Sequence, residues 1–243
     1  MVRVPVPARS PSRHYVRYVL GLLFVVNVFN FIDRQILAIL LEPIKEDLGV
    51  SDSAMGFLTG VAFALFYTAA GIPIARRADR GSRRTVIAVG LAIWSAMTAA
   101  SGLARTFAQL AAARLGVGIG EAACTPPAHS LLADYFPRER RSTALAIYGM
   151  GVHVGILFGF VIGGWVNEAF GWRAALYVVG LPGLLLAVLV ALTVREPIRG
   201  AADGVAPPAA PANPVMSPSV APTSRVPIWW TRTMNAGPHA ASA

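Results

Sequence analysis

The chain has 243 residues, of which 55% are hydrophobic and only 14% are charged, and its formal net charge is +9. Soluble domains usually carry about 25% charged residues, so this composition excludes an ordinary soluble domain and indicates a membrane protein. The sequence has neither a P-loop lysine motif nor a soluble catalytic domain, and we expect no enzyme. The single cysteine, Cys124, has no disulfide partner within the chain and is expected to be a small packing residue.

Six segments are long and apolar enough to cross a bilayer, which takes about 20 mostly apolar residues per helix. The predicted fold class is therefore an all-α membrane protein with six transmembrane helices. A basic N-terminus (1–16) precedes the bundle (17–199), and a Pro- and Ala-rich tail (200–243) is expected to be disordered. The six segments cover residues 17–41, 54–75, 85–104, 107–133, 143–169 and 173–194.

Basic residues outside the spans gather at one set of helix ends. Fourteen lie at the ends that include the N-terminus and the region after the last span, and three lie at the opposite ends. Because an excess of Lys and Arg marks the cytoplasmic side, we expect a multi-pass protein of a bacterial-type plasma membrane with its N-terminus and tail in the cytoplasm. The bilayer is then the expected partner of these arginines, and we expect no nucleic-acid partner.

Four charged residues lie well inside the predicted spans: Asp33, Arg34, Arg114 and Glu121. A charge at the centre of a membrane helix costs at least about 2.5–3.5 kcal/mol, so these side chains should face a cavity or one another. In the fourth segment, Arg114, Glu121 and Thr125 fall on one stripe of a helix. Asp33 with Arg114, and Arg34 with Glu121, are the charge-compatible pairs.

Ionisable groups inside a membrane are candidates for a transport path, so these four residues are candidates for substrate binding and proton coupling. Burial favours the protonated carboxyl and a nearby arginine opposes it, so that moving the arginine would load or release a proton. The alternative is a buried ion-pair network that only holds the first and fourth helices together. Secondary cavity candidates are polar residues on the same faces or in the fifth segment: Asn27, Asn30, Thr125 and His153.

Glycines in the fourth and fifth segments have different explanations. The pattern Gly118-x-Gly120-x-x-Ala123 resembles a dinucleotide-binding fingerprint, but it lies inside an apolar segment with no preceding strand, which argues against a nucleotide loop. In the fifth segment a glycine recurs every four residues from Gly151 to Gly163, which predicts close packing against a neighbouring helix. Pro126–Pro127 should kink or loosen the fourth helix.

The stretch ARRADRGSRR, residues 75–84, resembles the loop between the second and third helices of the major facilitator superfamily, G-x-L-A-D-R-x-G-R-R. Ala75, Arg77 and Ser82 depart from that pattern. NFIDRQ in the first segment and RLGVGIGEAACTPP in the fourth resemble the spinster-like members of the family. The residues that match the loop motif, for which the resemblance implies a gating role, are Asp79, Arg80, Arg83 and Arg84.

The resemblance covers about residues 15–200 and implies substrate binding and proton coupling for the four charged residues of the spans. Such transporters contain two six-helix halves with the substrate between them, and this sequence carries the motifs of the first half. It therefore implies a secondary active transporter of a small organic or lipid-like solute, with protons and no other cofactor. This chain is expected to be a truncated half that pairs with a missing C-terminal half. The alternatives are a non-transporting remnant or regulatory subunit, and an organic-anion symporter of another facilitator family.

Overall fold

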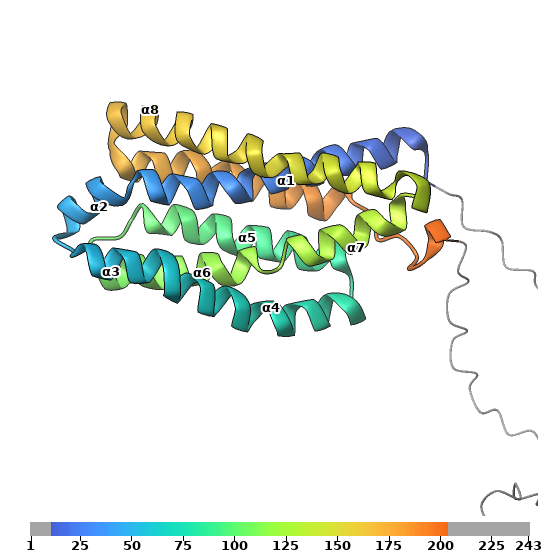
Figure 1. Cartoon of the computed structure of the whole chain (residues 1–243), viewed down its shortest axis with the longest axis horizontal. Helices are drawn as coiled ribbons and strands as arrows, with labels where there is room; N and C mark the ends of the chain where they lie inside the picture. The colour runs from blue at the N-terminus through green and yellow to red at the C-terminus, as the bar shows by residue number, and fades with distance from the viewer. Residues whose placement is uncertain (1–10, 204–243) are drawn as a thin grey trace, which may run out of the picture. The chain divides into compact units, whose positions relative to one another are not determined.

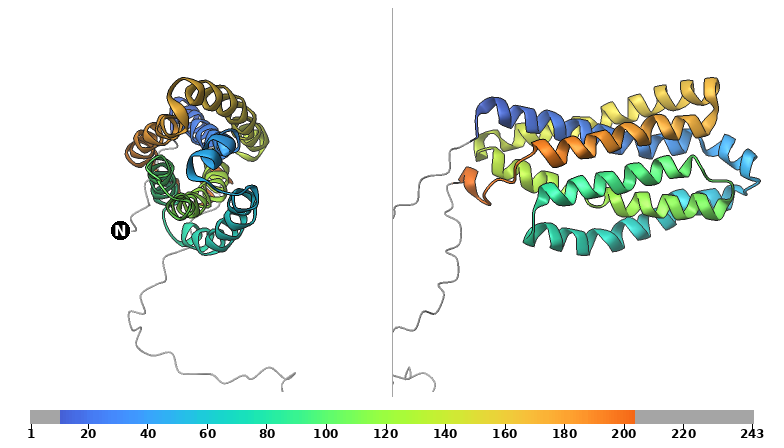
Figure 2. Two further views of the ribbon diagram at one scale, coloured as in Figure 1. Left: turned by 90° about the vertical axis from the view of Figure 1, so that its left-hand side faces the viewer. Right: turned by 180° about the vertical axis from the view of Figure 1, so that it is seen from behind.

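The computed structural model describes residues 11–203, which form helices joined by short connections (Figure 1). The long helices run roughly along one axis of the bundle, as the end-on view in Figure 2 also shows. The elements are α1 (Arg13–Ile39), α2 (Leu41–Leu48), α3 (Asp52–Phe57), the π-helical turn η1 (Leu58–Ala62), α4 (Phe63–Arg80), α5 (Arg83–Ser101), α6 (Phe107–Glu121), α7 (Thr125–Tyr135), α8 (Arg138–Thr193) and the 3-10 turn η2 (Ala201–Asp203).

These elements make six passes through the bundle, which confirms the predicted fold class. The second pass runs without interruption through α3, η1 and α4, and the fourth is broken between α6 and α7, next to Pro126–Pro127. The 56 residues of α8 contain two passes, which reverse at Gly171 and lie side by side in Figures 1 and 2. Gly171 has φ 81°, a conformation that favours glycine. Among residues 11–203, four helices are candidate membrane spans by length and composition: α1, 52–80, α5 and α8.

Both ends of the predicted bundle differ from the structure. The first helix begins at Arg13, where Ser12 caps it by accepting a hydrogen bond from the Tyr15 amide, so it includes residues assigned above to the basic N-terminus. At the other end, 200–203 form a turn that packs on the bundle, because Arg138 and Arg141 bind Asp203. Residues 1–10 and the predicted disordered stretch 204–243 lie outside the described residues.

The glycine stripe of α8 packs directly on α1, as the spacing predicts. A Cβ atom added at Gly155 would lie 2.6 Å from the carbonyl oxygen of Val28 and 2.7 Å from the Cβ of Phe31. Gly151 and Gly159 meet the same helix one turn away on either side. Only glycine permits this approach of two backbones, so the stripe sets the position of α1 and of the residues that α1 carries.

The buried apolar side chains form two clusters, one toward each end of the bundle. The first includes Leu23, Leu91 and Val117, and the second includes Ile36 and Leu110. Along α6, Arg114 lies between residues of the second and the first cluster. Arg114 therefore lies in the region where the two clusters meet.

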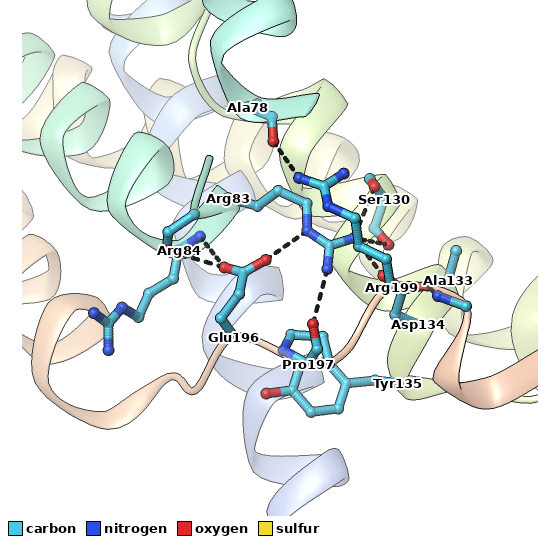
Figure 3. A network of polar contacts seen from close by, with 12 residues as sticks. Ala78, Arg83, Arg84, Ser130, Ala133, Asp134, Tyr135, Glu196, Pro197 and Arg199 are labelled. Atoms are coloured by element: carbon cyan, nitrogen blue, oxygen red, sulfur yellow. Dashed lines mark hydrogen bonds and ion pairs between the residues drawn. The ribbon is translucent and has the colours of Figure 1, made fainter. Parts of the chain in front are cut away.

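The end of the bundle where α1 begins and η2 lies, at the right of Figure 1, is called here the basic end. Its centre is Arg83, whose side chain is 2% exposed. Arg83 Nε donates to Glu196 Oε1 at 2.7 Å, and Nη1 donates to both Asp134 Oδ2 and the Ser130 carbonyl (Figure 3). One guanidinium thus joins the start of α5, the end of α7 and the segment after α8.

That segment, residues 194–203, is called here the strap because its charges bind several helix ends. Glu196 accepts from the Arg84 amide at 2.9 Å, at the positive end of α5. Arg199 donates to the Ala78 carbonyl at 2.6 Å, at the negative end of α4. Asp203 accepts from Arg141 at 2.9 Å, near the start of α8. The first two contacts place each charge where it complements the partial charge of a helix terminus.

The glycine stripe predicts a sharp difference between two substitutions in one helix. Gly155→Ala should lower the free energy of unfolding by about 1–3 kcal/mol, because the new methyl group has no room against α1. Gly164→Ala is the matched control, since a Cβ there meets no atom within 4 Å. Denaturant unfolding in detergent micelles measures both variants, and equal stability of the two would contradict close packing at Gly155.

Removing one charge of the strap should loosen the basic end. Glu196→Gln should lower the free energy of unfolding by about 1–3 kcal/mol, because Arg83 stays buried with one carboxylate in place of two. Glu46→Gln, at an exposed position of α2, serves as the control and should have little effect. The same unfolding measurement applies. A Glu196 variant as stable as the control would show that this contact contributes nothing to the free energy of unfolding.

The strap should also respond to acid through Asp203. Burial alone would raise the pKa of Asp203, but hydrogen bonds from Arg141 and Arg138 outweigh it and lower the pKa. A carboxylate with a lowered pKa adds stability that is complete above its unfolded value, about 3.9, and is lost as the pH falls through the folded value. The unfolding midpoints of the native protein and of Asp203→Asn should therefore differ near neutral pH and converge on acidification. A difference independent of pH would contradict this assignment.

Candidate functional site

A cavity of about 290 Å³ lies between α1, the second pass and α6. All four charged residues that the sequence places inside the spans line it, together with apolar side chains and one hydroxyl. The lining residues are Asp33, Arg34, Leu37, Ala38, Leu41, Leu58, Thr59, Phe63, Arg114 and Glu121. The cavity is therefore mostly apolar with a cluster of charges, as ligand sites usually are.

Both charge-compatible pairings form in the structure. Arg34 Nε donates to Glu121 Oε2 at 2.6 Å, and Arg114 Nη1 donates to Asp33 Oδ2 at 3.4 Å. The Asp33, Arg114 and Glu121 side chains are at most 3% exposed, whereas Arg34 is 32% exposed. The cluster is neutral as a whole, and Arg34 is its member most open to a ligand.

Aromatic rings hold the Arg34 guanidinium from three sides. Its central carbon lies 5.3 Å from the ring centroid of Phe31, 5.5 Å from that of Phe63 and 5.0 Å from that of Tyr67. A cation over an aromatic face is stabilised by about 0.5–2 kcal/mol. These rings come from α1 and α4, so Arg34 joins the first two passes as well as α6.

Asp33 has a further partner that sequence reasoning missed. Thr98 of α5 donates from Oγ1 to Asp33 Oδ1 at 2.6 Å, and both side chains are buried. This bond is shorter than the one from Arg114. The only sequence signal was a hydroxyl within an apolar helix, and Ser95 and Ser101 of the same helix give the same signal.

Three buried polar atoms of the residues that line the cavity have no hydrogen-bond partner within residues 11–203. They are Nε and Nη2 of Arg114 and Oε1 of Glu121. A buried polar group without a partner costs about 1–3 kcal/mol, more when it is charged. The site can therefore offer two donors of one arginine and one carboxylate oxygen to a polar ligand.

The break between α6 and α7 determines where Glu121 lies. Glu121 is the last residue of α6, and α7 restarts at Thr125, followed by Pro126–Pro127. At Gly120, the residue before Glu121, an added Cβ would lie 2.6 Å from the backbone nitrogen of Trp94. The backbones of α6 and α5 are therefore in direct contact at this point. Gly120, one of the two glycines that resembled a nucleotide fingerprint, is thus a packing position that brings the end of α6 against α5.

The secondary cavity candidates are not among the residues that line the cavity. Asn27 donates to the Tyr148 carbonyl at 2.8 Å, which ties α1 to α8. Asn30 is buried, Thr125 is half-buried at the start of α7, and His153 is exposed on α8, two residues from the Gly155 contact. Asn27 therefore has a packing contact, and the geometry assigns no cavity contact to the other three.

The predicted gating residues separate into two groups. Arg83 and Arg84 belong to the network at the basic end, whereas Asp79 and Arg80 are exposed at the end of α4. Sequence reasoning missed Asp134 and Glu196, the carboxylates that pair with Arg83. Their signal was the presence of acids beside a basic cluster, at the ends of the fourth and sixth passes.

Metal-binding geometry is absent from the described part of the chain. Within residues 11–203, no group of three or more His, Cys, Asp and Glu side chains could hold a metal ion. What the site offers chemically is ionic and hydrogen-bonding capacity in an apolar cavity.

Comparison with known proteins identifies curated relatives that are about one-third identical or more. The MFS-type efflux pump of Mycolicibacterium smegmatis is 40% identical over 174 residues, which are 72% of this chain and 41% of the pump. The probable galactarate/D-glucarate transporter GudP of Bacillus subtilis is 32% identical over 186 residues, 74% of this chain and 41% of that protein. The sphingosine-1-phosphate transporter SPNS2 of Danio rerio is 32% identical over 186 residues, 75% of this chain and 37% of that protein.

A solved structure gives the same assignment. A bacterial homolog to the human lysosomal transporter spinster, in an inward-facing and occupied conformation, matches with a TM-score of 0.75 and 40% identity, over 80% of this chain and 47% of that one. The chain thus spans less than half the length of these relatives and corresponds to their N-terminal half. The family model of the Major Facilitator Superfamily matches residues 23–235. The chain belongs to the Major Facilitator Superfamily and is similar to its spinster members.

Proposed function

We propose that this chain forms one wall of the solute path of a proton-coupled secondary transporter, and that the solute carries a carboxylate or phosphate group. The observation that carries the proposal is the neutral cluster of two arginines and two carboxylates in one cavity, with Arg114 Nε and Nη2 unpartnered within the described residues. Arginine presents several N–H donors in a fixed fork that matches carboxylate and phosphate oxygens.

Relatives support an anionic solute. The two transporters from Bacillus subtilis and Danio rerio are named for galactarate or D-glucarate and for sphingosine-1-phosphate, which differ in size but share an anionic group. The apolar lining of the cavity is compatible with either a small or a lipid-like body. The anionic group of either solute would accept hydrogen bonds from an arginine whose N–H donors have no other partner.

Proton coupling follows from charge balance. The cluster of Asp33, Arg34, Arg114 and Glu121 is neutral, so an anionic solute would give the buried site a net negative charge. Burial makes an uncompensated charge costly, and protonation of one carboxylate restores neutrality. Solute binding and proton uptake would therefore favour each other, which is the thermodynamic requirement for symport.

The other wall would come from a second six-helix unit. Facilitators hold the solute between two such units related by an axis along the membrane normal. The second pass is the least covered of the candidate spans, with 11% of its most apolar window buried, so we assign it to this contact. The basic end would face the cytoplasm according to the arginine distribution. A second candidate function is a unit that does not transport by itself, since facilitators hold the solute between two units.

Uptake into proteoliposomes tests the proposal. The full chain would be reconstituted alone and together with the C-terminal half of the Mycolicibacterium smegmatis pump, with a pH-sensitive dye and D-glucarate or sphingosine-1-phosphate as probes. Solute-dependent proton movement is expected with the second unit. Proton movement with the chain alone would exclude the second candidate function, whereas no movement with the chain alone would favour it. No signal for either probe in either preparation would contradict the proposal.

Substitutions then assign the residues. Arg114→Lys should raise the KM for the anionic probe at least about tenfold, because ammonium cannot replace the fork. Asp33→Asn and Glu121→Gln should abolish proton movement while solute exchange persists. Glu46→Gln, at an exposed residue that does not line the cavity, is the matched control and should behave as the native chain. Proton coupling that survives in both carboxylate variants would remove these residues from the mechanism.

A further inference from the structure

Asp33 is held at two points by two different helices. Its Oδ1 accepts the Thr98 hydroxyl of α5 at 2.6 Å, and its Oδ2 accepts Arg114 Nη1 of α6 at 3.4 Å. Thr98 is 0% exposed and Asp33 is 1% exposed, so water does not replace either contact freely. The bond from the hydroxyl has the usual length for an O–H donor to a carboxylate, about 2.5–2.7 Å, whereas the bond from Arg114 is longer than the usual length of about 2.7–2.9 Å.

The backbone that carries Thr98 has little freedom to move. A Cβ added at Gly180 of α8 would lie 2.6 Å from the backbone nitrogen of Ala99, the next residue along α5. One turn away, a Cβ added at Gly183 would lie 3.0 Å from the Cβ of Ser95. The α5 backbone at Thr98 is therefore a fixed position from which the hydroxyl reaches the Asp33 carboxylate.

We propose that Thr98 is a positioning residue that keeps one oxygen of Asp33 on α5, so that Arg114 cannot form a two-bond pair with Asp33. Arg114 then retains the two nitrogens, Nε and Nη2, that have no partner among the described residues. The placement of Asp33 is independent of transport, whereas its consequence for the solute rests on the function proposed above.

The charges around Asp33 come from two helices, α1 and α6. Arg114 contacts it from α6, and Glu121 of α6 lines the same cavity. Arg34, its neighbour on α1, is paired with Glu121 and lies against Tyr67 of α4. The ionisable residues of α5 are confined to its first two positions; on α8, His153 is exposed and Tyr177 packs at Gly102. Thr98 is thus an uncharged group that acts on Asp33 from α5.

Infrared difference spectroscopy of the full chain in lipid nanodiscs tests the positioning directly. Asp33→Asn identifies the bands of this carboxyl group. Thr98→Val keeps the shape of the side chain and removes its donor, so the Asp33 carboxylate stretch should shift. Thr98→Ser, which retains the hydroxyl, should restore the native spectrum.

Ser101→Ala is the matched control. Ser101 is a buried residue of the same helix, and its hydroxyl donates to the Met97 carbonyl within α5. An Asp33 spectrum unchanged in Thr98→Val, or changed equally in Ser101→Ala, would overturn the proposal. In the proteoliposome assay, Thr98→Val should raise the KM for D-glucarate or sphingosine-1-phosphate severalfold with a smaller change in kcat. A shifted spectrum with an unchanged KM would uphold the contact but refute its consequence for the solute, and the transport variants above test the proposed function separately.

Discussion

Charge neutralisation inside an apolar bundle is the constraint on which the rest of this structure depends. Two arginines and two carboxylates are enclosed by α1, the second pass and α6, where an unpaired charge would cost several kcal/mol. Each must therefore lie against a partner on another helix. Glycine contacts allow this by bringing α1 onto α8 and α6 onto α5 at backbone distance. The packing and the polar site are consequently two aspects of one arrangement.

Much of this could be predicted from the sequence, because the relevant signals are local. Apolar length gave six passes, the spacing of glycines gave the α1–α8 contact, and the signs of four charges gave both ion pairs. The Thr98 contact could not be predicted, since a hydroxyl in an apolar helix does not reveal what lies opposite. The rings around Arg34 likewise depend on how deep α4 sits beside α1.

The strap shows a different limit of sequence reasoning. Its residues follow the last apolar segment and lead into a Pro- and Ala-rich region, so composition assigned part of it to the tail. Its order comes from long-range pairs, such as Glu196 with Arg83 and Asp203 with Arg141, which no local pattern records. At the opposite end of the bundle, Arg173 binds Asp47 at 2.8 Å and stacks on Trp172. The cavity therefore lies between two ends that are each fastened by arginine.

The reversal at Gly171 divides α8 into two arms with separate attachments. The first arm packs closely on α1 through its glycines, and the second arm packs closely on α5 through Gly180 and Gly183. The hydrogen bonds that Asp33 accepts from Thr98 and Arg114 connect α1, which packs on the first arm, with α5 and α6. Asp33 is therefore a link across the bundle, and it fixes how these helices lie against one another.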